Sequence, residues 1–149
     1  MRVEGTHELP APREQVWSML MDPAVLKRCL PGCESLEPEG DNSYKAQIKI
    51  GLAAVKGAYT GSVRITDIDR PNSFTLAMEG KGSTGFVRGT ARVALADSAA
   101  ATSLRYDGDV AVGGLIAAVG QRMLQGMAST LVATFFQCFD REVRTPRTS

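Results

Sequence analysis

Residues 110–139 read VAVGGLIAAVGQRMLQGMASTLVATFFQCF and contain one charged side chain, Arg122. The stretch is long enough to raise the question of a transmembrane helix, which needs about 20 predominantly apolar residues. Glycine, glutamine and serine residues interrupt it, however, and no uninterrupted run of about 18 apolar residues remains. We therefore predict an amphipathic helix that follows Gly113-Gly114 and packs against the rest of the chain.

The two sides of this predicted helix differ sharply in polarity. On a helical projection, Arg122, Gln125, Ser129 and Asp140 gather in one narrow arc. The opposite side is broad and apolar, so it needs a concave surface elsewhere in the chain to cover it. The residues on this apolar side are Met123, Leu124, Met127, Leu131, Phe135 and Cys138.

Before this helix the sequence alternates between apolar and polar residues, as in strands that bury one face. We predict a strand at residues 2–9, short helices near 12–20 and 24–30, and a weak strand at 33–37. Five alternating strands follow from residue 43 onward. Because each is apolar on one side only, we predict an α+β fold in which a curved antiparallel sheet of about six to seven strands wraps around the long C-terminal helix.

Length and composition indicate one domain. The chain has 149 residues, of which 44% are apolar and 22% charged, and we predict a single domain at 1–143 with a loose tail at 144–149. The 17 basic and 16 acidic residues are spread along the chain, which favours neither nucleic acid nor anionic lipid as a partner. The lack of an apolar N-terminal signal and the odd number of cysteines, 3, predict residence in the reducing cytoplasm.

The inward faces of the predicted strands carry glycine where a packed core needs larger side chains. Glycine inside a strand permits strong curvature or bulges, and small residues on the inside of a curved sheet also leave space for a ligand. Both interpretations stay open at this point. The glycines concerned are Gly5, Gly57, Gly61, Gly80, Gly89 and Gly108.

The polar inward residues indicate what kind of ligand such a space would accept. They are His7, Tyr44, Tyr59, Tyr106 and, near a strand end, Asp67, with no basic residue among them. An unpaired charge in an apolar cavity costs several kcal/mol, roughly. We therefore predict a largely apolar ligand with one or two hydrogen-bonding atoms.

The strand faces and the apolar helix side together predict a cavity and its mouth. Successive antiparallel strands bring the loops at 51–54 and 82–85 and the Gly113-Gly114 junction to the same end of the sheet, where we place the mouth. The predicted mouth residues are Leu52, Gly85, Gly113, Gly114, Leu115 and Ile116, with Phe86 at the same rim. The predicted ligand-binding residues are Ile48, Ile50, Val55, Tyr59, Phe74, Leu76, Met78, Phe86, Tyr106, Met123, Met127, Leu131 and Phe135.

We predict no catalytic residue and no metal site. His7 is the single histidine of the chain and cannot form a triad or a metal site alone, so we interpret it as a satisfied interior residue. Cys29 and Cys33 resemble a metal or redox pair, but their spacing is unusual and no further ligands accompany them. We therefore predict that both are free thiols.

Several motifs resemble a known family. Val16-Trp17, Asp22-Pro23-Ala24-Val25-Leu26 and the segment Cys29-Leu30-Pro31-Gly32-Cys33-Glu34-Ser35-Leu36 resemble the family named after the G subunit of carbon monoxide dehydrogenase (CoxG), in the START-like (SRPBCC) superfamily. The resemblance extends over nearly the whole chain and implies the helix-grip fold. It continues through Val55-Lys56-Gly57, Tyr59-Thr60-Gly61, Gly85-Phe86-Val87, Gly113-Gly114-Leu115 and Phe135-Phe136.

This resemblance implies a non-catalytic accessory protein that serves a molybdenum hydroxylase of the carbon monoxide dehydrogenase type. It also implies a link between that enzyme and the respiratory membrane, which we predict as transient peripheral contact with the inner face. Our hypothesis is that the cavity carries a menaquinone-like or other isoprenoid molecule, which fits the inner surface without basic residues, and we predict no covalently bound cofactor. Two alternatives stay open. One is a small enzyme of the cyclase or hydratase type with His7 or Tyr59 as acid or base, and the other is a ligand-free assembly factor.

Overall fold

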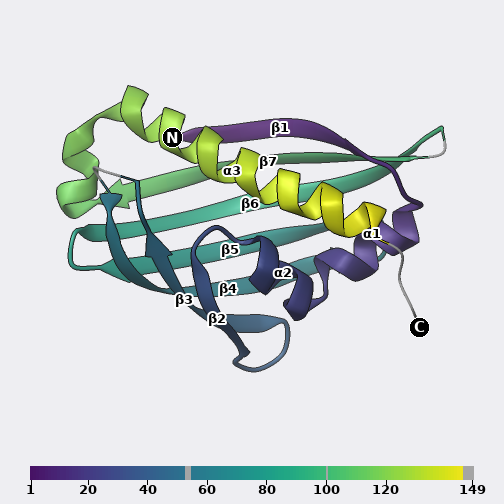
Figure 1. The fold of residues 1–149 in the computed structure, drawn as a ribbon, viewed down its shortest axis with the longest axis horizontal. Helices are drawn as coiled ribbons and strands as arrows, with labels where there is room; N and C mark the ends of the chain where they lie inside the picture. Colours follow the sequence, from purple (N-terminus) through teal and green to yellow (C-terminus); the bar gives the residue numbers. More distant parts are fainter. Residues whose placement is uncertain (53–54, 100, 146–149) are drawn as a thin grey trace.

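The computed structural model describes residues 1–52, 55–99 and 101–145. In this part of the chain, a seven-stranded antiparallel sheet curves around a long C-terminal helix, α3 (Gln121–Arg144), as Figure 1 shows. Two short helices, α1 (Arg13–Leu20) and α2 (Pro23–Cys29), cover one end of the sheet. This architecture confirms the predicted α+β class and the helix-grip fold. Of the predicted tail at 144–149, Arg144 is the last residue of α3, and residues 146–149 lie outside the described residues.

The sheet is a meander in which every neighbouring pair of strands is antiparallel. Its strand order is β1-β7-β6-β5-β4-β3-β2, so β5 lies at the centre. The alternation of the sequence appears as alternating burial, because the inner face of each strand turns toward α3 and the outer face toward solvent. The strands are β1 (Arg2–Leu9), β2 (Cys33–Pro38), β3 (Ser43–Ile50), β4 (Gly57–Asp69), β5 (Ser73–Gly82), β6 (Gly85–Ser98) and β7 (Ala101–Gly113).

Local sequence signals set the limits of α2. The Asp22 carboxylate accepts a hydrogen bond from the backbone N–H of Ala24 at 2.9 Å, and Pro23 occupies the first turn, where its missing N–H is not needed. After the helix, Gly32 adopts a φ of 73°, a left-handed conformation that glycine takes without strain. The chain then turns back into β2.

The long helix begins later than the sequence predicted. A 3-10 helix, η2 (Gly114–Val119), follows β7, and the chain breaks at Gly120 with a φ of 94° before α3 begins. Within this 3-10 helix the side chain of Ile116 is buried and packs with Val55 and Tyr59. Among the described helices, none combines the length and the apolar character that a membrane span needs.

The buried core divides into two clusters. The larger one lies where α1, α2 and the end of α3 pack on the sheet, around residues such as Trp17, Leu104 and Phe139. The smaller one is formed by Val55, Tyr59 and Ile116 at the opposite end, and we refer to these three residues as the end plug. The two clusters leave the central part of the sheet between them.

The face of α3 that packs on the sheet is rotated from the predicted one. Met123 is 50% exposed, so the prediction that it faces inward is wrong. The apolar stripe at Val132, Phe136, Phe139 and Val143 follows helical spacing, and Phe139 and Val143 are fully covered by the larger cluster. At 100° per residue, Met123 lies almost opposite this stripe, in agreement with its exposure.

Candidate functional site

Between the two clusters the inner surface of the sheet is apolar but not filled. Gly80 lies on the central strand, and a Cβ built on it would meet no atom within 4 Å. The inner positions Ile48, Val63 and Met78 are half-buried and belong to neither cluster. We refer to these four residues, with Gly61, as the middle band. Because protein interiors are normally close-packed, an unfilled band of this kind is the candidate binding site.

Helix α3 lies over the middle band without closing it. Its backbone approaches α2, β1 and η2 most closely, whereas the central strands lie farther from it. The side chains of Met127, Leu131 and Phe135 on the covering side of the helix remain half-buried. These half-buried apolar side chains and the open position at Gly80 delimit the candidate site.

The predicted ligand-binding residues fall into three groups. Val55, Tyr59 and Phe74 are buried within the two clusters, where they support the walls. Phe86 and Met123 are exposed and point away from the space. The remaining residues are half-buried on its walls or at its ends: Ile48, Ile50, Leu76, Met78, Tyr106, Met127, Leu131 and Phe135.

Phe86 and Asp67 lie elsewhere than predicted. Phe86 shares the outer face of β6 with Arg88, whose guanidinium carbon lies 5.6 Å from the centre of its ring. The prediction that Phe86 lines the cavity is therefore wrong, because side chains alternate along a strand. Asp67 is exposed because an irregularity in the pairing of β4 with β5 shifts the side-chain alternation after Thr66.

The predicted mouth segments do meet at one end of the sheet. The Tyr59 hydroxyl donates a hydrogen bond to the carbonyl of Val55 at 2.6 Å and lies 2.7 Å from the Thr84 hydroxyl. The backbone N–H of Ile116 donates to the carbonyl of Thr84 at 3.0 Å. Leu52 packs on the plug, and Gly85 touches Gly113 and Gly114 so closely that no side chain would fit between them. Ala53 and Ala54 lie outside the described residues.

A group of aromatic rings contributes polar atoms beside the middle band. The His7 ring stacks on Phe136, with ring centres 3.8 Å apart, and the Tyr106 ring lies nearly parallel to Phe136 at 5.8 Å. Gly5 makes room for Tyr106, because a Cβ there would lie 2.6 Å from its hydroxyl oxygen. Within the described residues, neither the His7 imidazole nor the Tyr106 hydroxyl has a hydrogen-bond partner. His7 is thus held by ring stacking rather than by satisfied hydrogen bonds.

The burial of His7 predicts a dependence of stability on pH. Burial lowers the pKa of His7 below its usual value, so the unfolded chain takes up a proton more readily than the folded one. The free energy of unfolding is expected to decrease as the pH falls below about 6.5. The variant His7→Phe should lose this part of the decrease, which thermal unfolding between about pH 5 and 8 would measure. Equal slopes for the two proteins would contradict the prediction.

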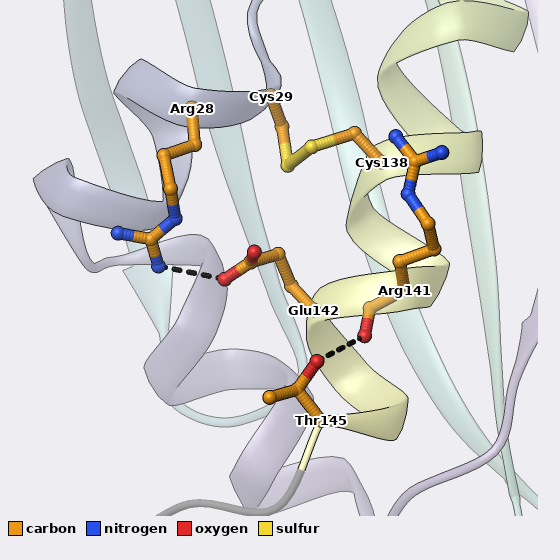
Figure 2. Close-up of a disulfide and its surroundings, with 6 residues drawn as sticks. All are labelled: Arg28, Cys29, Cys138, Arg141, Glu142 and Thr145. Carbon is orange, nitrogen blue, oxygen red and sulfur yellow. Dashed lines mark hydrogen bonds and ion pairs between the residues drawn. A yellow bond between two sulfur atoms is a disulfide. The ribbon is translucent and has the colours of Figure 1, made fainter.

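The second helix is joined to the long helix by a disulfide (Figure 2). Cys29, at the end of α2, is bonded to Cys138 of α3; their Cα atoms are 5.2 Å apart, and the two residues are separated by 109 positions in sequence. On the next turn of α3, the Glu142 carboxylate pairs with Arg28 at 2.6 Å. The prediction that Cys29 is a free thiol is wrong, because short-range spacing carries no information about a partner so far away. Cys33 is free, and burial raises the pKa of its thiol.

This disulfide also removes one argument about compartment. Disulfides persist mainly in oxidising surroundings, and the odd cysteine count was taken to indicate a reducing one. With Cys29 and Cys138 paired, the odd count reflects one leftover thiol, Cys33. The number of cysteines therefore does not support a reducing compartment.

Comparison with known proteins agrees with this geometry. Among solved structures, a conserved protein from Geobacillus kaustophilus is 41% identical with a TM-score of 0.94, covering 97% of this chain and 95% of that chain. A START superfamily protein from Mycobacterium smegmatis shares the fold at 12% identity, with a TM-score of 0.73 and coverage of 96% of this chain and 97% of that chain. No curated protein matches the chain. The model of the carbon monoxide dehydrogenase G subunit (CoxG) family matches residues 5–144, so the chain belongs to this family.

Proposed function

We propose that this chain is a non-catalytic accessory protein that binds an apolar small molecule in the middle band, between the sheet and α3. The observation that carries the proposal is the open space above Gly80, at the centre of an otherwise regular sheet. Concave, mostly apolar spaces with a few polar groups are typical of small-molecule sites. The family assignment and the START-like fold support a small accessory or ligand-binding protein.

The side chains around the space favour a particular class of ligand. The walls are formed by aliphatic, methionine and aromatic side chains, and the inner face carries no lysine or arginine among the described residues. Burial raises the pKa of Tyr106, so its hydroxyl remains a hydrogen-bond donor at neutral pH. A ring that bears a carbonyl acceptor, joined to an isoprenoid chain, satisfies both features. We propose a menaquinone-like molecule as the ligand.

The family name supports the partner in this proposal. The family is named after a component of carbon monoxide dehydrogenase, and we propose that this protein serves a molybdenum hydroxylase of that type. Presenting or removing a quinone at such an enzyme needs a site that holds the molecule without reacting with it. The Tyr59 hydroxyl is already engaged by Val55 and Thr84, which argues against the alternative role of Tyr59 as a catalytic acid or base.

Calorimetric titration with matched ligands tests the binding site. The wild-type protein should bind a short-chain menaquinone analogue, and Tyr106→Phe should bind it about three- to tenfold more weakly, because one hydrogen bond is lost. The corresponding naphthalene without carbonyl groups should bind both proteins equally. Tyr44→Phe provides the control, since Tyr44 packs on the larger cluster as Tyr106 does but does not belong to the ring group of His7, Tyr106 and Phe136.

The same titration separates the proposal from its rivals. An assembly factor without a ligand predicts no saturable binding of either compound, and that result would refute the carrier function. A cyclase or hydratase predicts chemical conversion of a bound substrate that is abolished by His7→Ala. A carrier predicts that the analogue is recovered unchanged from the complex.

A further inference from the structure

The disulfide between α2 and α3 exposes its two cysteines unequally to solvent. Cys29 belongs to the larger cluster and is only 2% exposed, whereas Cys138 is half-buried on α3. Thiol–disulfide exchange begins when a thiolate attacks one of the two sulfur atoms, so it depends on access to that atom. A reagent from solvent therefore reaches the sulfur of Cys138, and Cys29 is the leaving group.

Two arginines lie beside this disulfide. Arg28 directly precedes Cys29, and Arg141 lies one turn of α3 after Cys138, so that Figure 2 shows their side chains on either side of the bond between the sulfur atoms. Both arginines are exposed. Reactive cysteines are found in partly exposed, electropositive surroundings, where positive charge attracts an incoming thiolate. Cys138 has surroundings of this kind.

The third cysteine of the chain does not compete with an external thiol. Burial raises the pKa of the Cys33 thiol, so this thiol stays protonated at neutral pH, and only a thiolate attacks a disulfide. The thiol also donates a weak hydrogen bond of 3.3 Å to the carbonyl of Ser35. Exchange at the bond between Cys29 and Cys138 consequently requires a thiol from outside the chain.

We propose that Cys138 is the point of attack for a protein dithiol of the thioredoxin type, and that reduction frees the C-terminal half of α3 from α2. In the first step, a thiolate of the dithiol bonds to the sulfur of Cys138. The bond to Cys29 breaks, and the Cys29 sulfur leaves as a thiolate that takes a proton. In the second step, the other thiolate of the reductant displaces Cys138, which also takes a proton. The dithiol becomes a disulfide, and its two electrons pass to the two cysteines.

The contacts that remain after reduction hold α3 in place, but less tightly. Phe139 is fully buried and Val143 is 4% exposed, so the larger cluster keeps the end of the helix packed. The ion pair between Arg28 and Glu142 also remains, but exposed ion pairs contribute little to stability. The reduced protein is therefore expected to stay folded while the C-terminal half of α3 opens more often.

This half of α3 includes residues of the candidate site. Phe135 lies one turn before Cys138, is half-buried, and stacks on Phe139 with ring centres 5.7 Å apart. Leu131, one turn earlier, is also half-buried. More frequent opening of this segment would release a bound ligand faster, so that reduction regulates how long the ligand is held. This last step rests on the proposed function, whereas the point of attack and the freeing of α3 do not.

A trapping experiment tests the point of attack. Thioredoxin whose second active-site cysteine is replaced by serine does not complete the second step, so it should stay bonded to Cys138 of the folded, oxidised chain. Peptide mass spectrometry identifies the bonded cysteine. Cys33→Ser should be trapped to the same extent as the wild type. Attachment to Cys29 or Cys33, or attachment only after the chain is unfolded, would overturn this assignment.

Amide hydrogen exchange of two ligand-free variants tests the freeing of α3. Cys33→Ser keeps the disulfide, whereas the double variant Cys29→Ser with Cys138→Ser cannot form it. Dithiothreitol should speed exchange in residues 131–144 of Cys33→Ser by at least about tenfold and leave the double variant unchanged. Thermal unfolding verifies that both variants fold. Equal exchange of Cys33→Ser with and without dithiothreitol would contradict the freeing of the helix.

Ligand release separates this proposal from the proposed function. Cys33→Ser is reduced with dithiothreitol, the reductant is removed, and dissociation of the short-chain menaquinone analogue is compared with that from the oxidised protein. Reduction should speed dissociation by at least about threefold. An unchanged rate would overturn the regulation of ligand release. A protein that binds no analogue in either redox state would refute the proposed function, while the trapping and exchange experiments still decide the rest of this proposal.

Discussion

Replacing Cys138 with serine is expected to lower the free energy of unfolding by about 3–5 kcal/mol. The physical reason is the length of the loop that the disulfide closes, since Cys29 and Cys138 are 109 positions apart. Without the bond, the unfolded chain gains the entropy of that loop. For a protein of this size, thermal unfolding under non-reducing conditions should shift downward by about 10 °C or more.

A third cysteine provides the matched control for this experiment. Cys33 is half-buried and unbonded, and its thiol makes a weak hydrogen bond of 3.3 Å to the carbonyl of Ser35. Cys33→Ser should therefore leave the unfolding temperature almost unchanged. Alkylation of the unfolded, non-reduced protein should modify one thiol, and modification of three would show that the disulfide does not form.

The disulfide also bears on the space beneath α3. The C-terminal half of the helix is held by Cys29 and by the pair between Arg28 and Glu142, which join it to α2. The N-terminal half makes fewer bonds of this kind to the rest of the chain. One of them is the hydrogen bond that the side-chain amide of Gln125 donates to the carbonyl of Arg2 at 2.9 Å. Loss of the disulfide should thus loosen the wall of the site as well as the fold.

Replacing Gly80 with leucine is expected to abolish most ligand binding while the fold is retained. A Cβ at this position meets no atom within 4 Å, so the new side chain would extend into the open part of the middle band. It would occupy space that the ligand needs, and overpacking of this kind costs about 1–3 kcal/mol, which corresponds to roughly 10- to 100-fold in affinity for the menaquinone analogue. The unfolding temperature should stay within a few degrees of the wild type, because leucine suits a strand better than glycine does.

A second glycine shows why Gly80 is informative. Gly108 also lies on the inner face, but a Cβ there would be 2.8 Å from the backbone of Ala91 on the adjacent strand. Gly108→Ala should therefore lower the unfolding temperature, whereas Gly80→Leu should lower affinity. If Gly80→Leu bound the analogue as tightly as the wild type, the ligand would have to occupy another place.

Much of the fold followed from the sequence, whereas the packing of the long helix did not. Strand faces are local properties, because side chains alternate with a period of two, and the inner positions from Tyr44 to Ile50 were correctly assigned. Helix α3 begins only after the break at Gly120, and the 3-10 helix before it buries Ile116 in a tertiary contact. Met123 lies on the side of α3 almost opposite the stripe of Phe136, Phe139 and Val143, and it is exposed because that stripe is the side that packs in the larger cluster.

The candidate site was also predictable only in part, because it too depends on tertiary contacts. The inner glycines indicated a sheet whose inner face carries little side-chain volume, but the roles of these glycines differ. Gly5 accommodates the Tyr106 ring, Gly108 avoids the neighbouring backbone, and Gly80 faces open space. A sequence does not distinguish these roles, because each depends on the element that lies opposite the glycine.

The sequence by itself determined the alternating strands, the amphipathic long helix and the absence of basic residues on the inner face of the described strands, since these depend on neighbours along the chain. The tertiary structure decided which distant parts of the chain come into contact. It paired Cys29 with Cys138 across 109 positions. It also left open space at Gly80, outside the two packed clusters. These properties depend on which residues lie close together in space. The antiparallel pairing of the strands sets those distances, and the order of residues along the chain does not show them.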